Sequence, residues 1–321
     1  MFSLAHSSTT SENTENKINI QQLNAEFGVA QQIEFIVGKG NLPCIQINNS
    51  KASALISIYA AQVLSFKPIN ETADLMFISD NAFFQEGKAI KGGTPICWPW
   101  FGTAPDQGNQ NDLKRPAHGF VRNSFWSVSS ADVLANGDTK IVLEIEDSEQ
   151  TREIWPFRFQ LALEIVIGES LTLELLTRNT GNQPFTITEA LHTYINVGDA
   201  TQATVFGLEH TEYLNKKEDF IPMCQVGALT IAEETDHIHT DIKHQLIIED
   251  PVFKRKIKIT SSGNKNVVVW NPWAEIAAEM TDLKNDDYKY FICLEVANVA
   301  TDGVEILPGS EYRMDANYSV V

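Results

Sequence analysis

The sequence predicts an all-β protein built from antiparallel sheets that pack as a sandwich. A series of short segments carries β-branched or aromatic residues at every second position, which is the period of a half-buried strand. Clusters of turn-forming residues such as "NGD", "GES", "NTGNQP", "SSGN" and "LPGS" stand between these segments. Long helical patterns are scarce, and many strands without alternating helices favour antiparallel sheets.

The predicted strand segments follow one another through most of the chain. The best helical candidate is the polar stretch 10–28, "TSENTENKINIQQLNAEFG". The segments with strand periodicity are 54–66, 140–147, 157–168, 170–180, 185–197, 244–250, 255–263, 266–273 and 290–296.

The 321 residues are interpreted as one large domain behind a polar leader. No internal repeat, Gly/Ser linker or sharp change in composition divides the chain after residue 30. Residues 1–28 are rich in Ser, Thr, Asn and Glu, which is typical of a disordered segment. We therefore expect a disordered leader over 1–28 and a single β-sandwich domain over 29–321.

The charge balance excludes two classes of partner. The formal net charge is −18, from 24 Lys and Arg against 42 Asp and Glu. Nucleic acids and anionic membranes both require a basic surface, so neither is expected as a partner. No apolar run approaches the roughly 18–20 residues that span a bilayer, and the N-terminus lacks the pattern of a secretory signal. We expect a cytoplasmic monomer.

The cysteines predict free thiols and no metal centre. Cys44, Cys97, Cys224 and Cys293 are widely spaced and form no CxxC pair. Cys97 and Cys293 lie in apolar runs, as buried thiols in a reducing compartment do. The histidine cluster "HIHTDIKH" has no thiol nearby, so a zinc site is not expected there.

A carboxylate stands inside a segment that otherwise reads as a core strand. "KYFICLEVANV" (289–299) places Glu295 on one face with Phe291, Cys293 and Ala297. An isolated buried charge is costly, so Glu295 is expected to be ion-paired or functional.

A histidine occupies a comparable position in "ITEALHTYINV" (187–197). Alternation places His192 on one face with Tyr194 and Asn196, a polar set that can line a cleft. His192 and Glu295 are therefore a candidate acid/base pair. The alternative is that each is a hydrogen-bonded residue of the core.

Two loop segments gather cations and aromatic rings. "AIKGGTPICWPWFG" (89–102) and "RPAHGFVRNSFW" (115–126) contain Lys91, His118 and Arg122. The aromatic residues Trp98, Trp100 and Phe101 either form a floor for the apolar face of a sugar ring or plug one end of the sandwich. Neither glycine motif is a phosphate-cradling signature of the Walker or dinucleotide type.

Together these motifs resemble one family. "KGGTPICWPWFG", "AHGFVRN", "EALHTYINVGD", "TD" at 235–236, "VVVWNPW" and "ICLEVANV" occur in the order found in hexose-6-phosphate mutarotases, the glucose-6-phosphate 1-epimerase branch of the aldose 1-epimerase superfamily. The resemblance runs from about residue 50 to about residue 315 and implies the galactose-mutarotase-like β-supersandwich.

The resemblance implies a role for each candidate residue. His192 in "ALHTY" and Glu295 in "CLEVA" match the catalytic residues of the family. Arg122 and Asp236 match substrate-binding residues, and His118 matches a recurring active-site histidine. Lys91 departs from the pattern, because family members usually carry Arg before the double glycine. A lysine keeps the charge but loses the bidentate fork that suits phosphate.

The implied reaction is the interconversion of α and β anomers of a hexose 6-phosphate, glucose 6-phosphate above all. Glu295 would remove the proton of the anomeric hydroxyl and His192 would protonate the ring oxygen, with no cofactor or metal. Arg122 and Lys91 would hold the phosphate, and His118 and Asp236 would orient ring hydroxyls. The alternatives are a free-sugar aldose 1-epimerase and a non-catalytic sugar-phosphate-binding protein.

Overall fold

Four antiparallel sheets make up the structure, a computed structural model that describes residues 18–105, 115–240 and 242–321. The largest sheet has nine strands in the order β16-β13-β18-β19-β23-β9-β8-β7-β6. Its strands are β16 (Leu229–Thr230), β13 (Thr204–Phe206), β18 (Gln245–Asp250), β19 (Arg255–Ser262), β23 (Glu311–Val320), β9 (Ser170–Asn179), β8 (Phe159–Ile167), β7 (Thr139–Glu146) and β6 (Ser127–Val133).

Three smaller sheets complete the fold. A four-stranded sheet consists of β1 (Ile33–Val37), β2 (Pro43–Asn48), β3 (Ala52–Ser57) and β4 (Gln62–Pro68). An eight-stranded sheet consists of β15 (Ile221–Cys224), β14 (Glu212–Asn215), β17 (Thr235–His239), β20 (Asn266–Asn271), β21 (Phe291–Asn298), β11 (Glu189–Leu191), β12 (Tyr194–Asn196) and β5 (Ile96–Cys97). The fourth pairs β10 (Phe185–Ile187) with β22 (Val304–Ile306).

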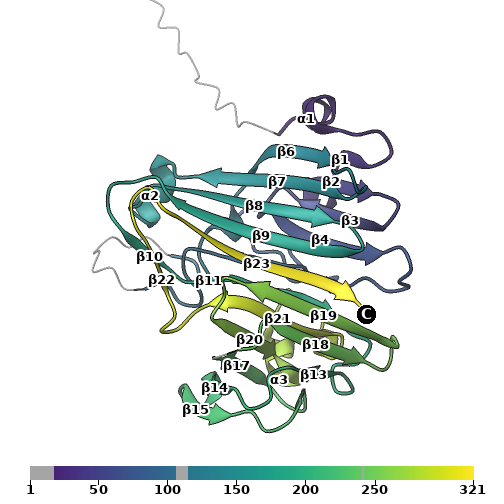
Figure 1. Cartoon of the computed structure of the whole chain (residues 1–321), viewed down its shortest axis with the longest axis vertical. Helices are drawn as coiled ribbons and strands as arrows, with labels where there is room; N and C mark the ends of the chain where they lie inside the picture. The colour runs from purple at the N-terminus through teal and green to yellow at the C-terminus, as the bar shows by residue number, and fades with distance from the viewer. Residues whose placement is uncertain (1–17, 106–114, 241) are drawn as a thin grey trace, which may run out of the picture.

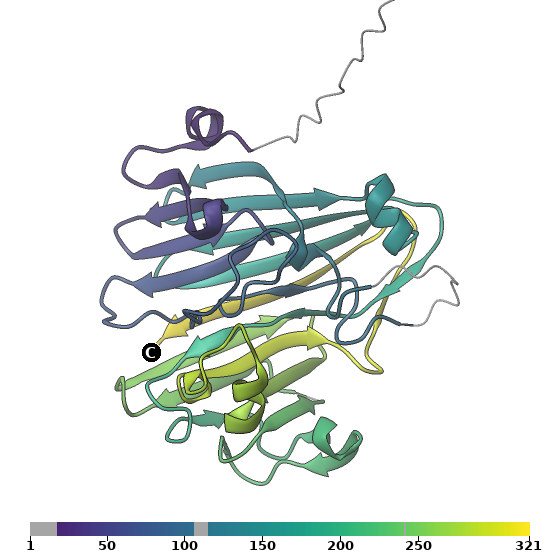
Figure 2. The same cartoon turned by 180° about the vertical axis from the view of Figure 1, so that it is seen from behind.

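The smaller sheets lie against one face of the nine-stranded sheet. Figures 1 and 2 show the four-stranded sheet behind β6–β9, and β20 and β21 of the eight-stranded sheet behind β18, β19 and β23. One cluster of buried apolar side chains, from Ile33 in β1 to Tyr318 in β23, fills the space between the layers. The predicted all-β antiparallel sandwich is confirmed.

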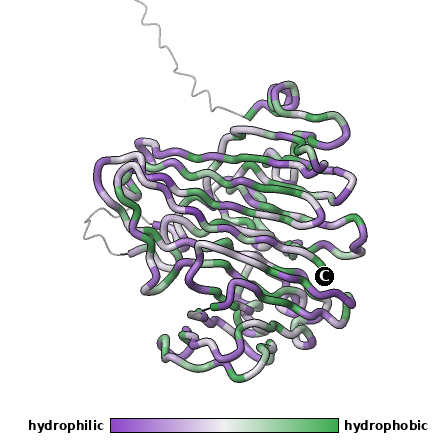
Figure 3. Tube along the Cα trace, viewed as in Figure 1, coloured by the Kyte–Doolittle hydropathy of each residue, from purple (hydrophilic) through white to green (hydrophobic). Residues whose placement is uncertain are grey.

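The alternation that predicted the strands is visible in their burial. β8 alternates buried and partly buried residues along its whole length, as one face packs on the core and the other meets solvent. The tube of Figure 3 shows hydrophobic and hydrophilic residues interchanging along the strands of the large sheet. β21 differs, because all its residues are buried.

The segment 54–66, predicted as one strand, forms a hairpin instead. β3 ends at Ser57 and β4 begins at Gln62, and the two pair antiparallel. The turn uses Ala60 and Ala61 at φ 68° and 47°, values that glycine adopts more readily. A turn without Gly, Pro, Asn or Asp leaves no signal in the sequence.

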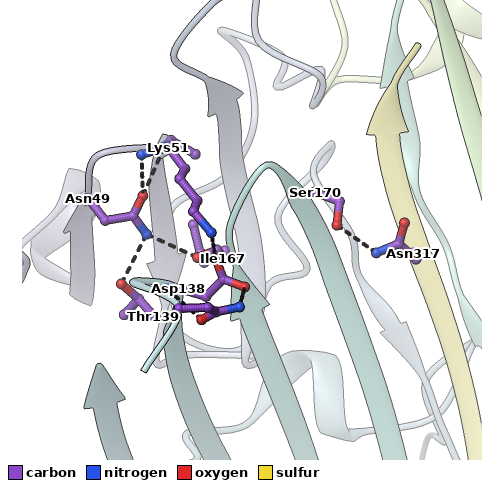
Figure 4. A network of polar contacts seen from close by, with 9 residues as sticks. Asn49, Lys51, Asp138, Thr139, Ile167, Ser170 and Asn317 are labelled. Carbon is purple, nitrogen blue, oxygen red and sulfur yellow. Dashed lines mark hydrogen bonds and ion pairs between the residues drawn. The ribbon is translucent and has the colours of Figure 1, made fainter. Parts of the chain in front are cut away.

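A polar network ties the four-stranded sheet to the turns of the large sheet (Figure 4). The Asn49 amide, between β2 and β3, donates to Thr139 Oγ1 at 3.1 Å and to the Ile167 carbonyl at 3.0 Å. The Lys51 ammonium pairs with Asp138 at 2.7 Å. These contacts join the turn between β2 and β3 to residues at the ends of β7 and β8, so they fix the four-stranded sheet against the nine-stranded one.

The helices are short. They are α1 (Ile20–Phe27), α2 (Glu149–Ile154) and α3 (Trp273–Glu279), with single-turn helices η1 (Lys39–Asn41), η2 (Val121–Asn123), η3 (Lys216–Glu218) and η4 (Asp287–Lys289). Among the described residues, no helix combines the length and apolarity needed to cross a membrane.

The expected disorder of the leader does not extend to its last residues. Asn19 caps α1 by accepting from the backbone N–H groups of Gln21 and Gln22. The Asn24 side chain exchanges hydrogen bonds of 2.7 and 2.9 Å with the backbone of Phe35 in β1, which anchors the helix. Residues 1–17 of the predicted leader lie outside the described residues.

Candidate active site

Glu295 lies at the centre of the eight-stranded sheet, opposite His192. The pairs Leu191–Val296 and Tyr194–Cys293 share one register, although β11 and β12 are interrupted at residues 192 and 193. That register sets His192 across from Glu295, and His192 Nε2 lies 3.3 Å from Glu295 Oε1. The structure thus brings the predicted acid/base pair into contact.

The two faces of β21 have different neighbours, as alternation predicted. Leu294 and Val296 belong to the main core between the sheets. Phe291 and Cys293 pack with Tyr194 on the opposite face, where Glu295 also points. Glu295 is 1% exposed, and because its neighbours on this face are apolar, its carboxyl group is poorly solvated.

A pocket of about 480 Å³ opens on this face of the sheet. All six residues that the sequence singled out line it, together with aromatic, apolar and charged side chains from other segments. The lining consists of Lys91, Phe101, His118, Arg122, His192, Tyr194, Lys216, Lys217, Glu234, Asp236, Val268, Trp270, Ile276, Met280 and Glu295.

Glycines allow the loops around the pocket to pack closely. Gly93, after Lys91, has φ 61°, and a Cβ there would lie 2.2 Å from the Val63 carbonyl oxygen. Gly119, after His118, has φ 75°, and a Cβ there would lie 1.7 Å from the Trp98 carbonyl oxygen. Only glycine fits either position, and Lys91 and His118, which line the pocket, stand next to these close contacts.

The tryptophans of "CWPWFG" belong to the core. Trp98 and Trp100 are 0% and 2% exposed, so the structural alternative holds for both. The Trp98 indole donates to Thr177 Oγ1 at 3.1 Å and that of Trp100 to the Pro116 carbonyl at 2.9 Å. Phe101 alone of the three lines the pocket.

Two other aromatic residues flank the catalytic candidates. The Tyr194 ring stacks on His192, with centroids 5.1 Å apart and planes at 12°. Trp270 meets His192 edge to face at 6.0 Å. Sequence reasoning quoted "VVVWNPW" but assigned Trp270 no role; its alternation with Val268 on β20 is the signal that places it on this face.

His118 has one ring nitrogen occupied by the loop. Nδ1 accepts from the Gly102 backbone N–H at 3.3 Å and lies 3.4 Å from Cys97 Sγ. The neutral ring therefore carries its proton on Nε2. Burial lowers the pKa of His118 to about 3, helped by the charge of Arg122, so the ring is a neutral donor.

The cations of the pocket differ in whether a nearby carboxylate offsets their positive charge. Lys91 Nζ lies 3.5 Å from Asp282, and Lys216 Nζ lies 2.7 Å from Asp236. Arg122 donates to the Ala117 carbonyl at 3.0 Å and, within the described ranges, forms no ion pair; its Nε is buried without a partner. Arg122 thus offers the least compensated positive charge.

Burial pushes Glu295 and His192 toward their uncharged forms. Desolvation raises the pKa of Glu295 well above the ordinary 4.5, and the charge of Asp236 raises it further. Desolvation, then His118 and Arg122, lowers the pKa of His192 well below 6.5. Near neutral pH the pair therefore holds one proton, which resides mainly on the carboxyl. Because its ring is buried, His192 does not titrate in the range of an exposed histidine.

One group in the described ranges has the composition of a metal site. Ligand atoms of His192, Cys293 and Glu295 all lie within 4.8 Å of one another. The contact between His192 and Glu295 occupies two of these atoms, and positive charges of Lys91 and Arg122 act on the group. This setting suits an anion or a neutral polar ligand better than a divalent cation.

Comparison with known proteins gives consistent matches over most of the chain. The aldose 1-epimerase family model matches residues 43–319. A protein of Escherichia coli K12 provisionally named glucose-6-phosphate 1-epimerase is 33% identical over 273 residues, covering 84% of this chain and 88% of that protein. A protein of the same provisional name from Cenchrus ciliaris is 35% identical over 271 residues, covering 81% and 79%.

Solved structures share the fold. The crystal structure of a provisionally named mutarotase from Salmonella typhimurium has a TM-score of 0.82 at 29% identity and covers 94% of this chain and 99% of that one. A galactose mutarotase related enzyme from Lactobacillus acidophilus has a TM-score of 0.69 at 13% identity, covering 87% and 97%. The predicted supersandwich fold is thereby confirmed.

Proposed function

The chain belongs to the aldose 1-epimerase family and is an isomerase, and from this premise we propose that it interconverts the α and β anomers of hexose 6-phosphates, glucose 6-phosphate first among them. The observation that carries the proposal is the contact of His192 with Glu295 in a pocket that also holds the uncompensated charge of Arg122.

The reaction needs one proton removed and one proton supplied. Ring opening takes the proton from the anomeric hydroxyl and delivers one to the ring oxygen; the carbonyl then presents its other face and both transfers run in reverse. We assign the first role to Glu295 and the second to His192. Within the part of the chain that the structure describes, the buried Glu295 Oε2 and His192 Nδ1 have no hydrogen-bond partner, so neither atom is committed to another side chain.

The state of the pair suits a reaction that must run in both directions. A protonated carboxyl beside neutral imidazole and a carboxylate beside imidazolium contain the same single proton. Transfer across the 3.3 Å between Oε1 and Nε2 converts one form into the other. The second form has the base and the acid that ring opening requires.

Arg122 is proposed as the main phosphate anchor. Among the described residues the Arg122 guanidinium has no acidic partner and keeps its charge for the phosphate, whereas Lys91 is partly neutralised by Asp282. His118, as a neutral donor, and Asp236, as an acceptor, are assigned to ring hydroxyls.

The experiment compares two substrates. Anomerisation of freshly dissolved α-glucose 6-phosphate and α-glucose is followed with and without the protein, above the spontaneous rate. Acceleration of the phosphate alone supports the proposal. Equal or greater acceleration of free glucose supports the free-sugar epimerase, which the compensated Lys91 favours. Acceleration of neither supports a non-catalytic binding protein.

Three further properties are part of the proposal. We take residues 29–321 as one domain, since one cluster of buried side chains spans β1 to β23. The four cysteines are free thiols and three are buried, in keeping with a reducing cytoplasm. All six candidate residues meet in one pocket, so the proposed reaction needs no residue from a second copy, and we expect the enzyme to act as a monomer.

A further inference from the structure

The Asp236 carboxylate, proposed to bind a ring hydroxyl, is held by a neighbouring lysine. Lys216 opens η3, directly after β14, which pairs with the strand that carries Asp236. Its Nζ donates to Asp236 Oδ2 at 2.7 Å. The Asp236 side chain is 14% exposed and that of Lys216 is 55% exposed, so the lysine reaches inward from the rim to a largely buried carboxylate.

The next residue makes a different contact from the same turn. Lys217 Nζ lies 3.3 Å from Glu233 Oε2, and the Glu233 side chain is 78% exposed. Exposed pairs of this kind contribute little, because water screens them. Both lysines line the pocket, but only Lys216 holds a carboxylate that we assign to the substrate.

We propose that Lys216 is a positioning residue for the epimerase reaction: its ion pair with Asp236 fixes the carboxylate at the substrate and balances its negative charge on the face that carries Glu295. This inference rests on the proposed function. Because the Asp236 carboxylate is already fixed, substrate binding does not have to supply the entropy cost of ordering it. Balancing the charge limits the repulsion that Asp236 exerts on a carboxylate forming at Glu295.

The second effect has a definite sign. Asp236 raises the pKa of Glu295, whereas Lys216 and Arg122 lower it. Loss of the Lys216 charge therefore makes protons harder to remove from the His192–Glu295 pair, and both limbs of its pH profile move to higher pH. The other titratable or charged groups on this face are His118, Lys91, Tyr194, Cys293, Arg122, Lys217 and Glu234.

The test measures kcat/KM against pH for α-glucose 6-phosphate in a matched set of variants. We expect Lys216→Ala to lower kcat/KM about three- to tenfold, the range of a partly exposed charge-assisted bond. The alkaline limb of its pH profile should move to higher pH by about 0.5–1 unit, the size of effect that one nearby charge has on a pKa. Lys216→Arg should restore both values. Lys256→Ala, which removes a lysine of similar exposure from an ion pair outside the pocket lining, is the control and should match the wild type.

Removal of the partner separates charge balance from position. Asp236→Asn should move the alkaline limb to lower pH, and Lys216→Ala/Asp236→Asn should return it near the wild-type value, because the pair is then removed as a neutral unit. The double variant should still bind substrate more weakly, because the acceptor is lost.

The outcomes distinguish this inference from the function on which it rests. Wild-type protein without epimerase activity refutes the proposed function. Active wild type with Lys216→Ala indistinguishable from Lys256→Ala overturns the role of Lys216. A lower kcat/KM with an unmoved alkaline limb overturns the charge-balancing part.

Discussion

His192 Nε2 and Glu295 Oε1 lie 3.3 Å apart on neighbouring strands that keep one register across the interruption between β11 and β12. The contact is enclosed, with side-chain exposures of 10% and 1%. Two titratable groups this close and this buried act as a unit that gains and loses protons together. Several expected results follow from this unit and from the charges around it.

Replacement of either member should remove most turnover. Glu295→Gln keeps the shape of the side chain but cannot accept the anomeric proton, and His192→Ala removes the group that supplies the other. We expect kcat to fall by at least about a hundredfold in each, the usual contribution of general acid–base catalysis. Circular dichroism and melting temperature should stay near wild type; near wild-type rates in either variant would refute the assignment.

The pH profile of kcat/KM should have a broad plateau around neutrality. Activity needs one proton on the pair, so it is lost when a second proton enters at low pH and when the first leaves at high pH. Burial raises the pKa of Glu295 and lowers that of His192, so the limbs move apart. The alkaline limb is the cleaner measurement, because substrate phosphate itself titrates near pH 6. A decline that begins below pH 7 on the alkaline side would contradict this state of the pair.

Arg122 should matter more than Lys91 for phosphate binding. Arg122→Ala should cost roughly 1.5–3 kcal/mol of binding, the scale of a hydrogen bond to a charged group. The loss should appear in KM more than in kcat, because the phosphate is remote from the reacting atoms. Lys91→Ala should raise KM less, since Asp282 already offsets that charge. With glucose as substrate neither variant should change KM, and equal effects on both sugars would rule out a phosphate anchor.

A second buried carboxyl should make the stability of the fold depend on pH between about pH 5 and about pH 8. Glu189 in β11 is 0% exposed, and its only described hydrogen bond comes from the Asn298 amide at 3.2 Å. Burial raises its pKa from 4.5 to about 8. Between these values the folded protein binds a proton that the unfolded chain has released, so the free energy of unfolding falls as pH rises, and the fall ends above about pH 8. Glu189→Gln does not titrate, so its melting temperature should gain on wild type between pH 5 and 8; a constant difference would exclude Glu189 as the cause.

Alternation along two strands was sufficient to predict the floor of the site. Glu295 stands in a largely apolar segment and His192 in one that mixes apolar and polar residues, and period two assigned each to a face that the structure confirms. It could not predict that the segments are neighbours in one register, because strand pairing depends on the topology of the whole sheet.

The rim was less predictable than the floor. Lys216 lies far from the other site residues in sequence and in a segment with no motif, so nothing local indicates that β14 pairs with the strand of Asp236. For Trp98 and Trp100 the sequence left a sugar platform and a core plug open, because a buried indole with a hydrogen-bond partner is equally at home in a core, where the structure places both. Contacts between distant segments decide both cases.

The division between floor and rim has a consequence for how such an enzyme can diversify. Glu295 belongs to a strand buried along its entire length, so the residues beside it are constrained by folding as well as by chemistry. Lys91, Arg122 and Lys216 stand on loops and single-turn helices. Substitutions at these positions can change which substituent of a sugar the pocket binds, at little cost in the stability of the fold. A lineage with this architecture can therefore acquire new sugar specificities by mutation of its loops, while one catalytic pair is inherited unchanged.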